Sequence, residues 1–367
     1  MVDRIHGGNL RAISYKYGVD PRQVIDFSSN VNSFGPPKVV VDYLSQVNIE
    51  DVVNYPDMDC WDLKSALAKK TMVDEKNLLM TNGSSEAITL LANHFCPPRA
   101  LVVKPTFCEY EIAVNSIGGI VKGFNLPKED NFALSLNSLI PAINQVDLLF
   151  LCNPNNPTGS LYSKDVLIRL LEEADKKGVF VVADEAFMDF ASNKKDYSLI
   201  RSINDFGNLA ILGSLTKFYS LAGLRIGYIA SNEVLIKELR CKLPAWNVNT
   251  LAQKAALLAL GDDGFEQITL RKIMEAKGEF YSALSDIPGL KVYPSASNFL
   301  LVEVLADNPD MDNFYLSLLK CGFYIRNCAS FSGLSQKFFR VAIRQKEENQ
   351  KLVEAIRKVL SSQEGCL

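Results

Sequence analysis

The stretch SLTKFYSLAGLRIGY, residues 214–228, carries the densest set of reactive side chains in the chain. Ser214, Thr216 and Arg225 can together hold a phosphate dianion, because two hydroxyls and a guanidinium donate charge-assisted hydrogen bonds. Lys217 lies between them, and a lysine that is partly desolvated beside other cations has a lowered pKa and becomes a nucleophile. A surface loop with an ordinary lysine and arginine is the alternative, but many apolar residues flank this segment. The stretch therefore predicts a phosphate site built around a reactive lysine.

The chain around this stretch alternates between two kinds of pattern. Short apolar runs predict buried parallel strands at 99–105, 147–154, 179–186 and 209–214. Apolar residues at helical spacing predict helices at 84–95, 108–118 and 163–178, the last with Ser163 as N-cap and Gly178 as its end. This alternation predicts an α/β fold with a mostly parallel sheet.

The character of the chain changes from about residue 265. A long charged helical pattern at 265–287 leads into shorter strand patterns at 291–304 and 339–344, which indicates a smaller α+β lobe. We therefore predict a large domain over residues 45–250. Residues 1–44 and 251–367 would form an N-terminal segment and a small C-terminal domain.

Composition excludes several classes of protein. Hydrophobic residues make up 48% and charged residues 22% of the 367 residues, which excludes a disordered or fibrous chain. The net charge of −3 argues against a nucleic-acid surface, and no apolar stretch is long enough for a membrane span. The N-terminal decapeptide lacks an apolar signal core, so we expect a cytoplasmic protein. Eight scattered cysteines and two histidines show no metal-ligand spacing, so we expect reduced thiols and no metal.

Three further motifs fall at predicted strand ends, where ligands bind in open α/β sheets. The motif TNGSSEA, residues 81–87, places Gly83, Ser84 and Ser85 at a helix start, where free N–H groups and the helix dipole suit a phosphate. The motif NPNNPTG, residues 153–159, is either a rigid turn or a bend that presents asparagines to a cleft. The motif DEAFMDF, residues 184–190, ends an apolar run with an acid pair that we expect to face a ligand.

In this order and spacing, the four motifs resemble the pyridoxal 5'-phosphate aminotransferase family of fold type I, over essentially the whole chain. The resemblance implies that Lys217 attaches the cofactor covalently. It also implies that Asp184, rather than Glu185, pairs with the ring nitrogen and keeps it protonated, so that the ring can accept electrons. The remaining cofactor contacts that it implies are the phosphate ligands Gly83, Ser84, Ser85, Ser214, Thr216 and Arg225, the ring-hydroxyl partner Asn156, the stacking ring of Phe107, and Tyr55.

The resemblance also bears on assembly, and the sequence departs from the family pattern at one position. Tyr55 matches a tyrosine that reaches the phosphate of the neighbouring subunit, which implies a homodimer with sites at the interface. Phe187 stands where many relatives carry tyrosine, so a hydroxyl donor to the ring oxygen is missing. That loss would make the oxygen more basic, unless Phe187 simply packs beneath the cofactor.

Several segments are similar to threonine-phosphate decarboxylases of cobalamin biosynthesis, and next to histidinol-phosphate aminotransferases. They are HGGN (6–9), IDFSSNVNSFGPP (25–37), NYPD (54–57), YIRNCASFSGL (324–334) and FRVAIR (339–344). The resemblance implies a carboxy-lyase that acts on L-threonine O-3-phosphate, with L-serine O-phosphate as another candidate substrate. An aminotransferase remains the alternative. A ligand-binding or regulatory module is a third reading, against which the intact Lys217, Asp184 and Arg225 argue.

A phosphorylated amino acid needs two anion sites. Arg326 and Arg340 can supply bidentate grips, since each sits among apolar strand residues where an unpaired charge would be costly. Arg344 shares a strand face with Arg340 by alternation, so we expect it to support the site. By resemblance, further substrate contacts come from His6, Gly7, Asn30 and Asn156. The proton donor to Cα stays open between Lys217, Tyr219 and water.

Overall fold

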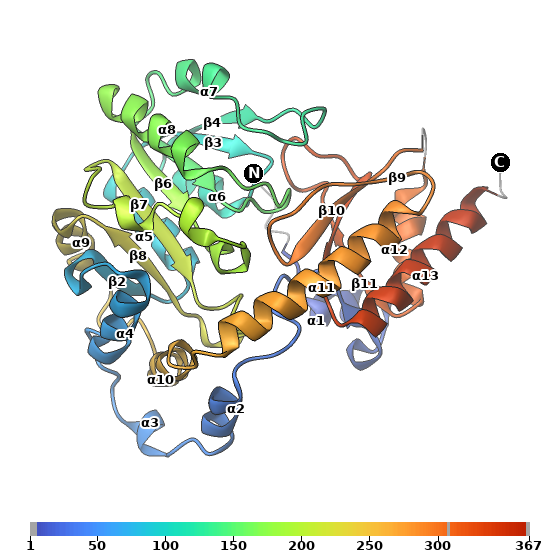
Figure 1. Ribbon diagram of the computed structural model, residues 1–367, viewed down its shortest axis with the longest axis horizontal. Helices are drawn as coiled ribbons and strands as arrows, with labels where there is room; N and C mark the ends of the chain where they lie inside the picture. Colours follow the sequence, from blue (N-terminus) through green and yellow to red (C-terminus); the bar gives the residue numbers. More distant parts are fainter. Residues whose placement is uncertain (1–5, 307–308, 365–367) are drawn as a thin grey trace.

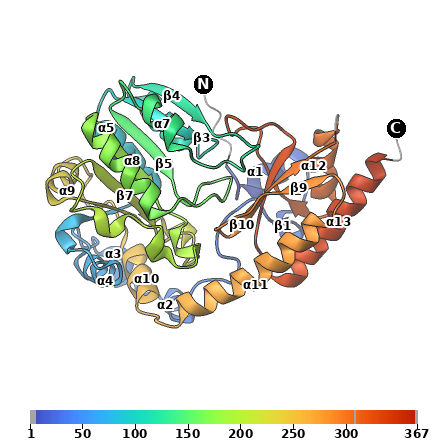
Figure 2. The ribbon, with the colours of Figure 1, turned by 45° about the horizontal axis from the view of Figure 1, so that its top comes forward.

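The chain folds into two lobes that α11 (Phe265–Ser285) connects, as Figures 1 and 2 show. The coordinates are a computed structural model that describes residues 6–306 and 309–364. The large lobe contains a seven-stranded sheet and the small lobe a four-stranded sheet. This is the α/β architecture with a mostly parallel sheet that the alternation of patterns predicted, and it agrees with the fold type I architecture that the family resemblance implies.

The large sheet has the strand order β2-β8-β7-β6-β5-β3-β4, and all pairs are parallel except those that β8 makes. The four predicted strands are confirmed as β3, β5, β6 and β7. The strands are β2 (Leu78–Thr81), β3 (Arg99–Lys104), β4 (Ile120–Asn125), β5 (Leu148–Cys152), β6 (Phe180–Asp184), β7 (Leu209–Ser214) and β8 (Gly227–Ser231).

Helices cover both faces of this sheet, which explains why its central strands are apolar throughout. In β5, Leu148 and Phe150 pack with α5 (Ser84–His94) and α6 (Glu109–Ser116), while Leu149 and Leu151 pack with α8 (Lys164–Lys176) on the other face. The predicted helices are confirmed, including the Ser163 cap, whose hydroxyl accepts from the Val166 N–H. The remaining helices of this lobe are α4 (Trp61–Thr71), α7 (Leu136–Ala142), α9 (Glu233–Arg240) and α10 (Thr250–Leu260).

The small lobe has an antiparallel sheet of order β12-β13-β10-β9, packed against α11, α12 and α13. Its elements are β9 (Leu290–Val292), β10 (Phe299–Val304), α12 (Met311–Lys320), β12 (Arg326–Asn327), β13 (Phe338–Ala342) and α13 (Lys346–Glu364). The N-terminal segment joins this lobe, because β1 (Ile25–Asp26) pairs in parallel with β11 (Phe323–Tyr324). Three short N-terminal helices are α1 (Leu10–Tyr17), α2 (Lys38–Ser45) and α3 (Glu50–Val53).

The division at residue 250 remains a proposal. The two sheets lie on its two sides, but α10, which follows residue 250, packs against α2 and α4. The change between lobes in the chain therefore falls along α11, which reaches the core of the small lobe through Ala276, Phe280 and Leu284.

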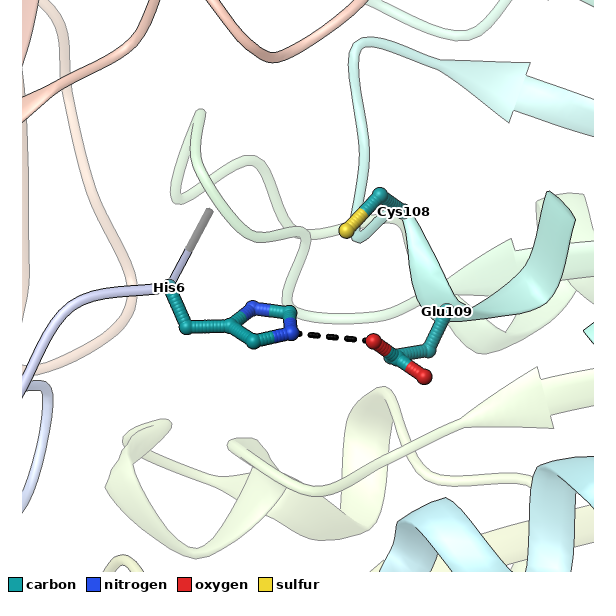
Figure 3. A group of neighbouring side chains, drawn as sticks. All are labelled: His6, Cys108 and Glu109. Carbon is teal, nitrogen blue, oxygen red and sulfur yellow. Dashed lines mark hydrogen bonds and ion pairs between the residues drawn. The ribbon is translucent and has the colours of Figure 1, made fainter. Parts of the chain in front are cut away.

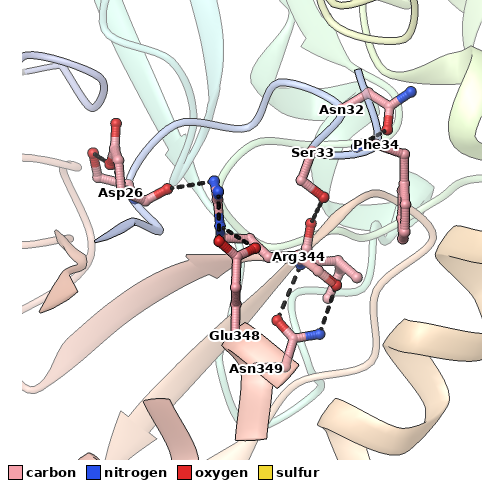
Figure 4. A network of polar contacts seen from close by, with 9 residues as sticks. Asp26, Asn32, Ser33, Phe34, Arg344, Glu348 and Asn349 are labelled. Carbon is pink, nitrogen blue, oxygen red and sulfur yellow. Dashed lines mark hydrogen bonds and ion pairs between the residues drawn. The ribbon is translucent and has the colours of Figure 1, made fainter. Parts of the chain in front are cut away.

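Arg344 ties the N-terminal segment to the small lobe, as Figure 4 shows. Its guanidinium donates to Glu348 at 3.0 and 3.1 Å and to the Asp26 carbonyl at 3.1 Å. Ser33 adds a hydrogen bond to the Ile343 carbonyl at 3.0 Å. The side chain thus lies outside the cavity that contains Arg340, and it supports the site by fixing the segment that contributes Ser28 and Asn30.

Two further expectations concern the chain as a whole. The seven cysteines among the described residues are free thiols, and Cys366 lies outside the described part. Within 6–306 and 309–364, the helices include none with the length and apolar character that crossing a membrane requires. The lack of a signal core at residues 1–5 concerns a part of the chain that the structure does not describe.

Candidate active site

A cavity of about 510 Å³ lies where the C-terminal ends of β6 and β7 meet the small lobe. The large lobe contributes the starts of α5 and α6, and the small lobe contributes β12 and β13. The cavity brings together most of the residues that the sequence predicted for the site. They are His6, Gly7, Asn30, Ser84, Ser85, Phe107, Asn156, Asp184, Thr216, Lys217, Arg225, Arg326 and Arg340.

Lys217 follows β7 and faces this cavity. Burial, together with the charges of Arg340 and Arg225, lowers the pKa of its ammonium group to about 8, against the opposing effect of Asp184. A larger share of the amine is therefore neutral at physiological pH than for a solvent-exposed lysine. This is the environment that makes a lysine nucleophilic.

Asp184 is the last residue of β6, and two hydrogen bonds fix its carboxylate. The Tyr110 hydroxyl donates to Oδ2 at 2.6 Å and the Ala186 N–H donates to Oδ1 at 2.9 Å. Burial raises the pKa of the carboxyl group, while these two donors and Lys217 oppose the rise. The carboxylate is thus oriented and held as an acceptor inside the cavity, as a partner for a protonated ring nitrogen must be.

The phosphate end of the cavity is formed by the N-terminus of α5, Thr216 and Arg225. The Ser214 and Thr216 hydroxyls lie 2.6 Å apart, so Ser214 supports Thr216 from outside the cavity wall. Gly83 also lies behind the wall. Gly83 has a positive φ of 76°, and a Cβ there would lie 2.6 Å from Arg225 Nη2, so a side chain at this position would be strained and would displace the guanidinium. Arg225 itself has a left-handed φ of 61°, a strained conformation that the surrounding fold must maintain.

Phe187 belongs to an aromatic cluster that supports Arg340. Its ring lines the cavity and packs edge-on against Phe299 with centroids 5.2 Å apart. Phe299 also contacts the Arg340 guanidinium, whose central carbon lies 5.4 Å from the ring centroid. Tyrosine is therefore not needed here for packing, and the phenyl ring helps to position an arginine in the cavity.

Arg326 and Arg340 face each other across the β12–β13 pair. Each is at most 5% exposed, and both line the cavity. Burial, together with the Arg326 charge, lowers the pKa of Arg340 to about 10, against the opposing effects of Cys328 and Asp26. Arg340 donates to the Asn156 Oδ1 atom and to the Ser28 carbonyl, and Arg326 donates to Ser330 Oγ at 2.7 Å. Like charges opposite one another on a sheet are unfavourable, so the pair indicates an anionic ligand.

The N-terminal segment closes one side of the cavity. A Cβ at Gly7 would lie 2.0 Å from the Ser28 carbonyl oxygen, so the segment passes Ser28 too closely for any side chain. The Ser28 hydroxyl accepts from the Gly8 N–H at 2.8 Å. Both polar side-chain atoms of Asn30 are buried without a hydrogen-bond partner, although Asn30 lines the cavity. A ligand group in the cavity would satisfy this amide.

His6 reaches α6 across the cavity edge, as Figure 3 shows. Its Nε2 atom lies 2.9 Å from the Glu109 Oε1 atom, and its ring lies 5.5 Å from the Phe107 ring. The Cys108 thiol stands beside them, and the donor atoms of His6, Cys108 and Glu109 all lie within 4.8 Å of one another. Burial raises the pKa of Cys108, so the thiol is neutral. His6, Cys108 and Glu109 thus form a contact that joins the N-terminal segment to the large lobe.

Some predicted residues lie elsewhere. Tyr55 is 78% exposed and stacks on Trp246 with centroids 4.3 Å apart, outside the cavity of its own chain. Tyr219 is buried outside this cavity too, so its hydroxyl is not placed beside Lys217 as a proton donor. Residues that the sequence did not single out include Tyr110, Ser28 and Ser330. The available signal was the place of Tyr110 in the first turn of α6, three residues after Phe107 in the same motif.

The residues present fit pyridoxal 5'-phosphate. Lys217 offers a nucleophilic amine, Asp184 an oriented carboxylate, and Ser84, Thr216 and Arg225 a phosphate cradle. Phe107 would cover the ring, and Asn156 would exchange its contact with Arg340 for the ring hydroxyl.

Comparisons with known proteins point the same way. The model of the family "Aminotransferase class I and II" matches residues 22–356. A threonine-phosphate decarboxylase from Salmonella typhimurium is 35% identical over 97% of this chain and 96% of its own. A histidinol-phosphate aminotransferase from Methanocaldococcus jannaschii is 30% identical over 97% of this chain and 95% of its own. The solved L-threonine-O-3-phosphate decarboxylase from Porphyromonas gingivalis has 28% identity and a TM-score of 0.80, over 92% of this chain and 99% of that one.

Proposed function

We propose, from the premise that this chain belongs to the aminotransferase class I and II family, that it decarboxylates L-threonine O-3-phosphate. The products would be (R)-1-amino-2-propanol O-2-phosphate and CO₂, which would place the reaction in cobalamin biosynthesis. Pyridoxal 5'-phosphate is the cofactor, as in the family. The decarboxylase that is 35% identical over nearly the whole chain supports this choice of reaction.

The buried arginine pair carries the proposal. The substrate has a carboxylate and a phosphate, and Arg326 and Arg340 offer two cationic grips in the cavity that contains Lys217. Two guanidiniums, each at most 5% exposed on paired strands, are stabilised when anions neutralise them. We assign Arg340 to the carboxylate and Arg326, with His6 and Asn30, to the phosphate.

When bound, the cofactor supplies a conjugated ring that accepts the electron pair released at Cα. The protein's own groups do the rest. Lys217 provides the amine for attachment, and Asp184 keeps the ring nitrogen protonated. The Cα–carboxylate bond breaks, CO₂ leaves, and its electron pair is finally neutralised by a proton at Cα. Lys217 lines the cavity and Tyr219 does not, which favours Lys217 over Tyr219 for that proton.

Histidinol-phosphate aminotransferase is the second candidate. The relative from Methanocaldococcus jannaschii, 30% identical over 362 residues, favours it, and a buried arginine pair could also serve a dicarboxylate partner substrate. The two reactions differ in one requirement. An aminotransferase needs an oxo acid to regenerate its cofactor, whereas a decarboxylase turns over without one.

Product analysis by mass spectrometry tests the proposal. Threonine phosphate, serine phosphate and histidinol phosphate are offered separately to the holoenzyme, with and without 2-oxoglutarate. We expect catalytic CO₂ release from threonine phosphate in the absence of 2-oxoglutarate. Serine phosphate lacks one methyl group and should react more slowly, since one methyl in a pocket is worth about 1–3 kcal/mol. Turnover of histidinol phosphate only with 2-oxoglutarate would establish the second candidate instead.

The proposal includes the assembly and location of the enzyme. Tyr55 is exposed on the outside of its own large lobe, where it could complete the phosphate site of a second subunit. We therefore propose a homodimer. We also propose a cytoplasmic enzyme without nucleic-acid or membrane partners, consistent with the acidic net charge of −3.

A further inference from the structure

A second cavity of about 250 Å³ lies behind the active site, and we call it the rear cavity. Its walls come from α4, from the chain after β6, and from the ends of β7 and β8. Its lining includes Glu185, Ser214, Tyr219, Lys164, Lys195 and Arg201. None of these residues except Ser214 belongs to the cofactor site.

The two cavities share the ends of β6 and β7. At the end of β6, Asp184 faces the active site and its neighbour Glu185 faces the rear cavity. At the end of β7, Ser214 and Leu215 face the rear cavity, while Thr216 and Lys217 face the active site. The acid pair of the DEAFMDF motif is therefore divided between two cavities.

The inner wall of the rear cavity contains an unsatisfied hydroxyl. Tyr219 is 1% exposed, and its hydroxyl has no hydrogen-bond partner among the described residues. The ring is held by stacking on Phe265, with centroids 5.7 Å apart. A buried hydroxyl without a partner costs free energy, so its retention points to a ligand atom or water that accepts its proton.

The two carboxylates of the inner wall already have hydrogen-bond or ion-pair partners. Glu185 accepts from the Ser198 hydroxyl at 2.5 Å and from the Leu199 N–H at 2.7 Å. Asp189 pairs with Lys194 at 3.1 Å. Neither carboxylate therefore needs a bound cation, whereas the Tyr219 hydroxyl lacks a hydrogen-bond acceptor.

The lining of the rear cavity is cationic overall. Five cationic side chains line it, Lys70, Lys164, Lys194, Lys195 and Arg201, against the two carboxylates of Glu185 and Asp189. Lys70 and Lys194 are neutralised in part by Glu266, to which their ammonium groups lie 2.8 and 2.6 Å away. The excess positive charge thus comes from Lys164, Lys195 and Arg201, which must outweigh the carboxylates of Asp189, Glu266 and Asp262 near the Tyr219 hydroxyl to attract an anion.

We propose that the rear cavity binds a small oxyanion ligand, a carboxylate or phosphate ester of metabolite size. The Tyr219 hydroxyl donates to the ligand, and the cations Lys164, Lys195 and Arg201 neutralise its charge. The volume is smaller than that of sites for drug-sized ligands, which suits a compact metabolite. The apolar walls of Leu67, Met188, Leu215 and Leu260 would cover its carbon atoms.

Selenate tests the proposal, because it is an oxyanion whose selenium scatters X-rays anomalously. Crystals of the holoenzyme are soaked in selenate, and we expect an anomalous peak within hydrogen-bond distance of the Tyr219 hydroxyl. Peaks at Arg326 and Arg340 serve as an internal control for the soak. Peaks at those arginines without one in the rear cavity would overturn the proposal.

Calorimetry of the holoenzyme in solution supplies the second measurement. Tyr219→Phe should bind one selenate fewer than the wild type, or bind it about tenfold more weakly, with the active-site component unchanged. Lys195→Gln should weaken the same component, while Lys176→Gln, an exposed lysine of α8, should leave it unaltered. Identical isotherms for the wild type and Lys195→Gln, with Tyr219→Phe also unchanged or unfolded, would refute the assignment.

Discussion

At the scale of single residues, the Tyr110 hydroxyl controls the carboxylate that faces the cofactor. Tyr110 is fully buried. Its hydroxyl donates to Asp184 at 2.6 Å, and its ring stacks on Phe150 with centroids 5.1 Å apart. Because Asp184 has a pKa already raised by burial, the donor opposes protonation of the carboxyl group. Tyr110 thus acts through Asp184, as a positioning residue.

Tyr110→Phe should weaken cofactor binding by about tenfold and destabilise the protein by about 1–3 kcal/mol, because one carboxylate oxygen loses its buried donor. Cofactor affinity is measured by fluorescence titration of the apoenzyme, and stability by urea unfolding. Tyr162→Phe is the matched control, since that buried hydroxyl donates to the Phe132 carbonyl at 3.3 Å, away from the cavity. Equal cofactor affinity in Tyr110→Phe and the wild type would contradict this role.

The amine of Lys217 makes a prediction about pH. With a pKa of about 8, its neutral fraction should rise as pH passes through 8 and should be nearly complete by pH 9.5. The rate at which the apoenzyme captures pyridoxal 5'-phosphate at Lys217 should follow this curve. Borohydride reduction at timed intervals, with peptide mass spectrometry, measures that rate.

Two arginine variants test which charges set the midpoint of this pH profile. Arg340→Met removes a cation that lowers the Lys217 pKa, so the midpoint should move to higher pH. Arg344→Met should leave the midpoint in place, because that guanidinium pairs with Glu348 and lies outside the cavity. A wild-type midpoint above pH 10 would show that Lys217 is an ordinary lysine.

At the scale of elements, the N-terminal segment depends on long-range contacts for its place at the site. The pairing of β1 with β11 and the Arg344 network attach it to the small lobe, while His6 contacts Glu109 of the large lobe. The segment thus lies against both lobes at the cavity. Its position depends on the close approach of Gly7 to Ser28.

Gly7→Ala should displace this segment and raise the KM for the phosphorylated substrate by about tenfold, or about 1.4 kcal/mol, with a smaller effect on kcat. The cofactor absorbance should stay normal, because Lys217 and the phosphate cradle lie on other elements. Gly207→Ala is the control, since a Cβ there meets no atom within 4 Å. Unchanged kinetics in Gly7→Ala would show that the segment does not touch substrate.

At the scale of the whole molecule, the N-terminal helices expose an apolar surface. Figure 1 shows α2 and α3 projecting from the lower edge of the large lobe. Exposed apolar side chains recur between residues 39 and 61, and such surfaces often mark interfaces between chains, which supports the proposed homodimer. The exposed side chains of this surface are Val39, Val41, Leu44, Ile49, Val52, Val53, Tyr55, Met58 and Trp61.

Val53→Glu should therefore shift the protein from a dimer to a monomer of 40.7 kDa in sedimentation velocity. The variant should also bind the cofactor more weakly, since it loses the partner's contribution from Tyr55. Val234→Glu is a closely matched control: Val234 on α9 and Val53 are both 67% exposed. If Val53→Glu sediments as the wild type does, the proposed interface lies elsewhere.

Much of this architecture was predictable because its signals are local. Apolar runs such as 147–154 identified the central strands, and the clustered hydroxyls and cations of 214–228 pointed to Lys217, which the structure places in the cavity. Strand period, helix caps and motif chemistry are properties of neighbouring residues, so they can be read along the chain. The role of α10 was harder to assign, because it follows the expected boundary yet packs on helices of the large lobe.

By itself, therefore, the sequence determined the α/β fold, and through its family resemblance it indicated the cofactor and proposed Lys217 as the reactive amine. Only the tertiary structure decided which side chains act on one another. The Tyr110–Asp184 bond spans 74 residues, the His6–Glu109 contact spans 103, and Phe187 reaches Arg340 only through Phe299. The tertiary structure also places the neighbours Asp184 and Glu185 in different cavities. Such pairings depend on how separate elements pack, and no periodicity along the chain encodes them.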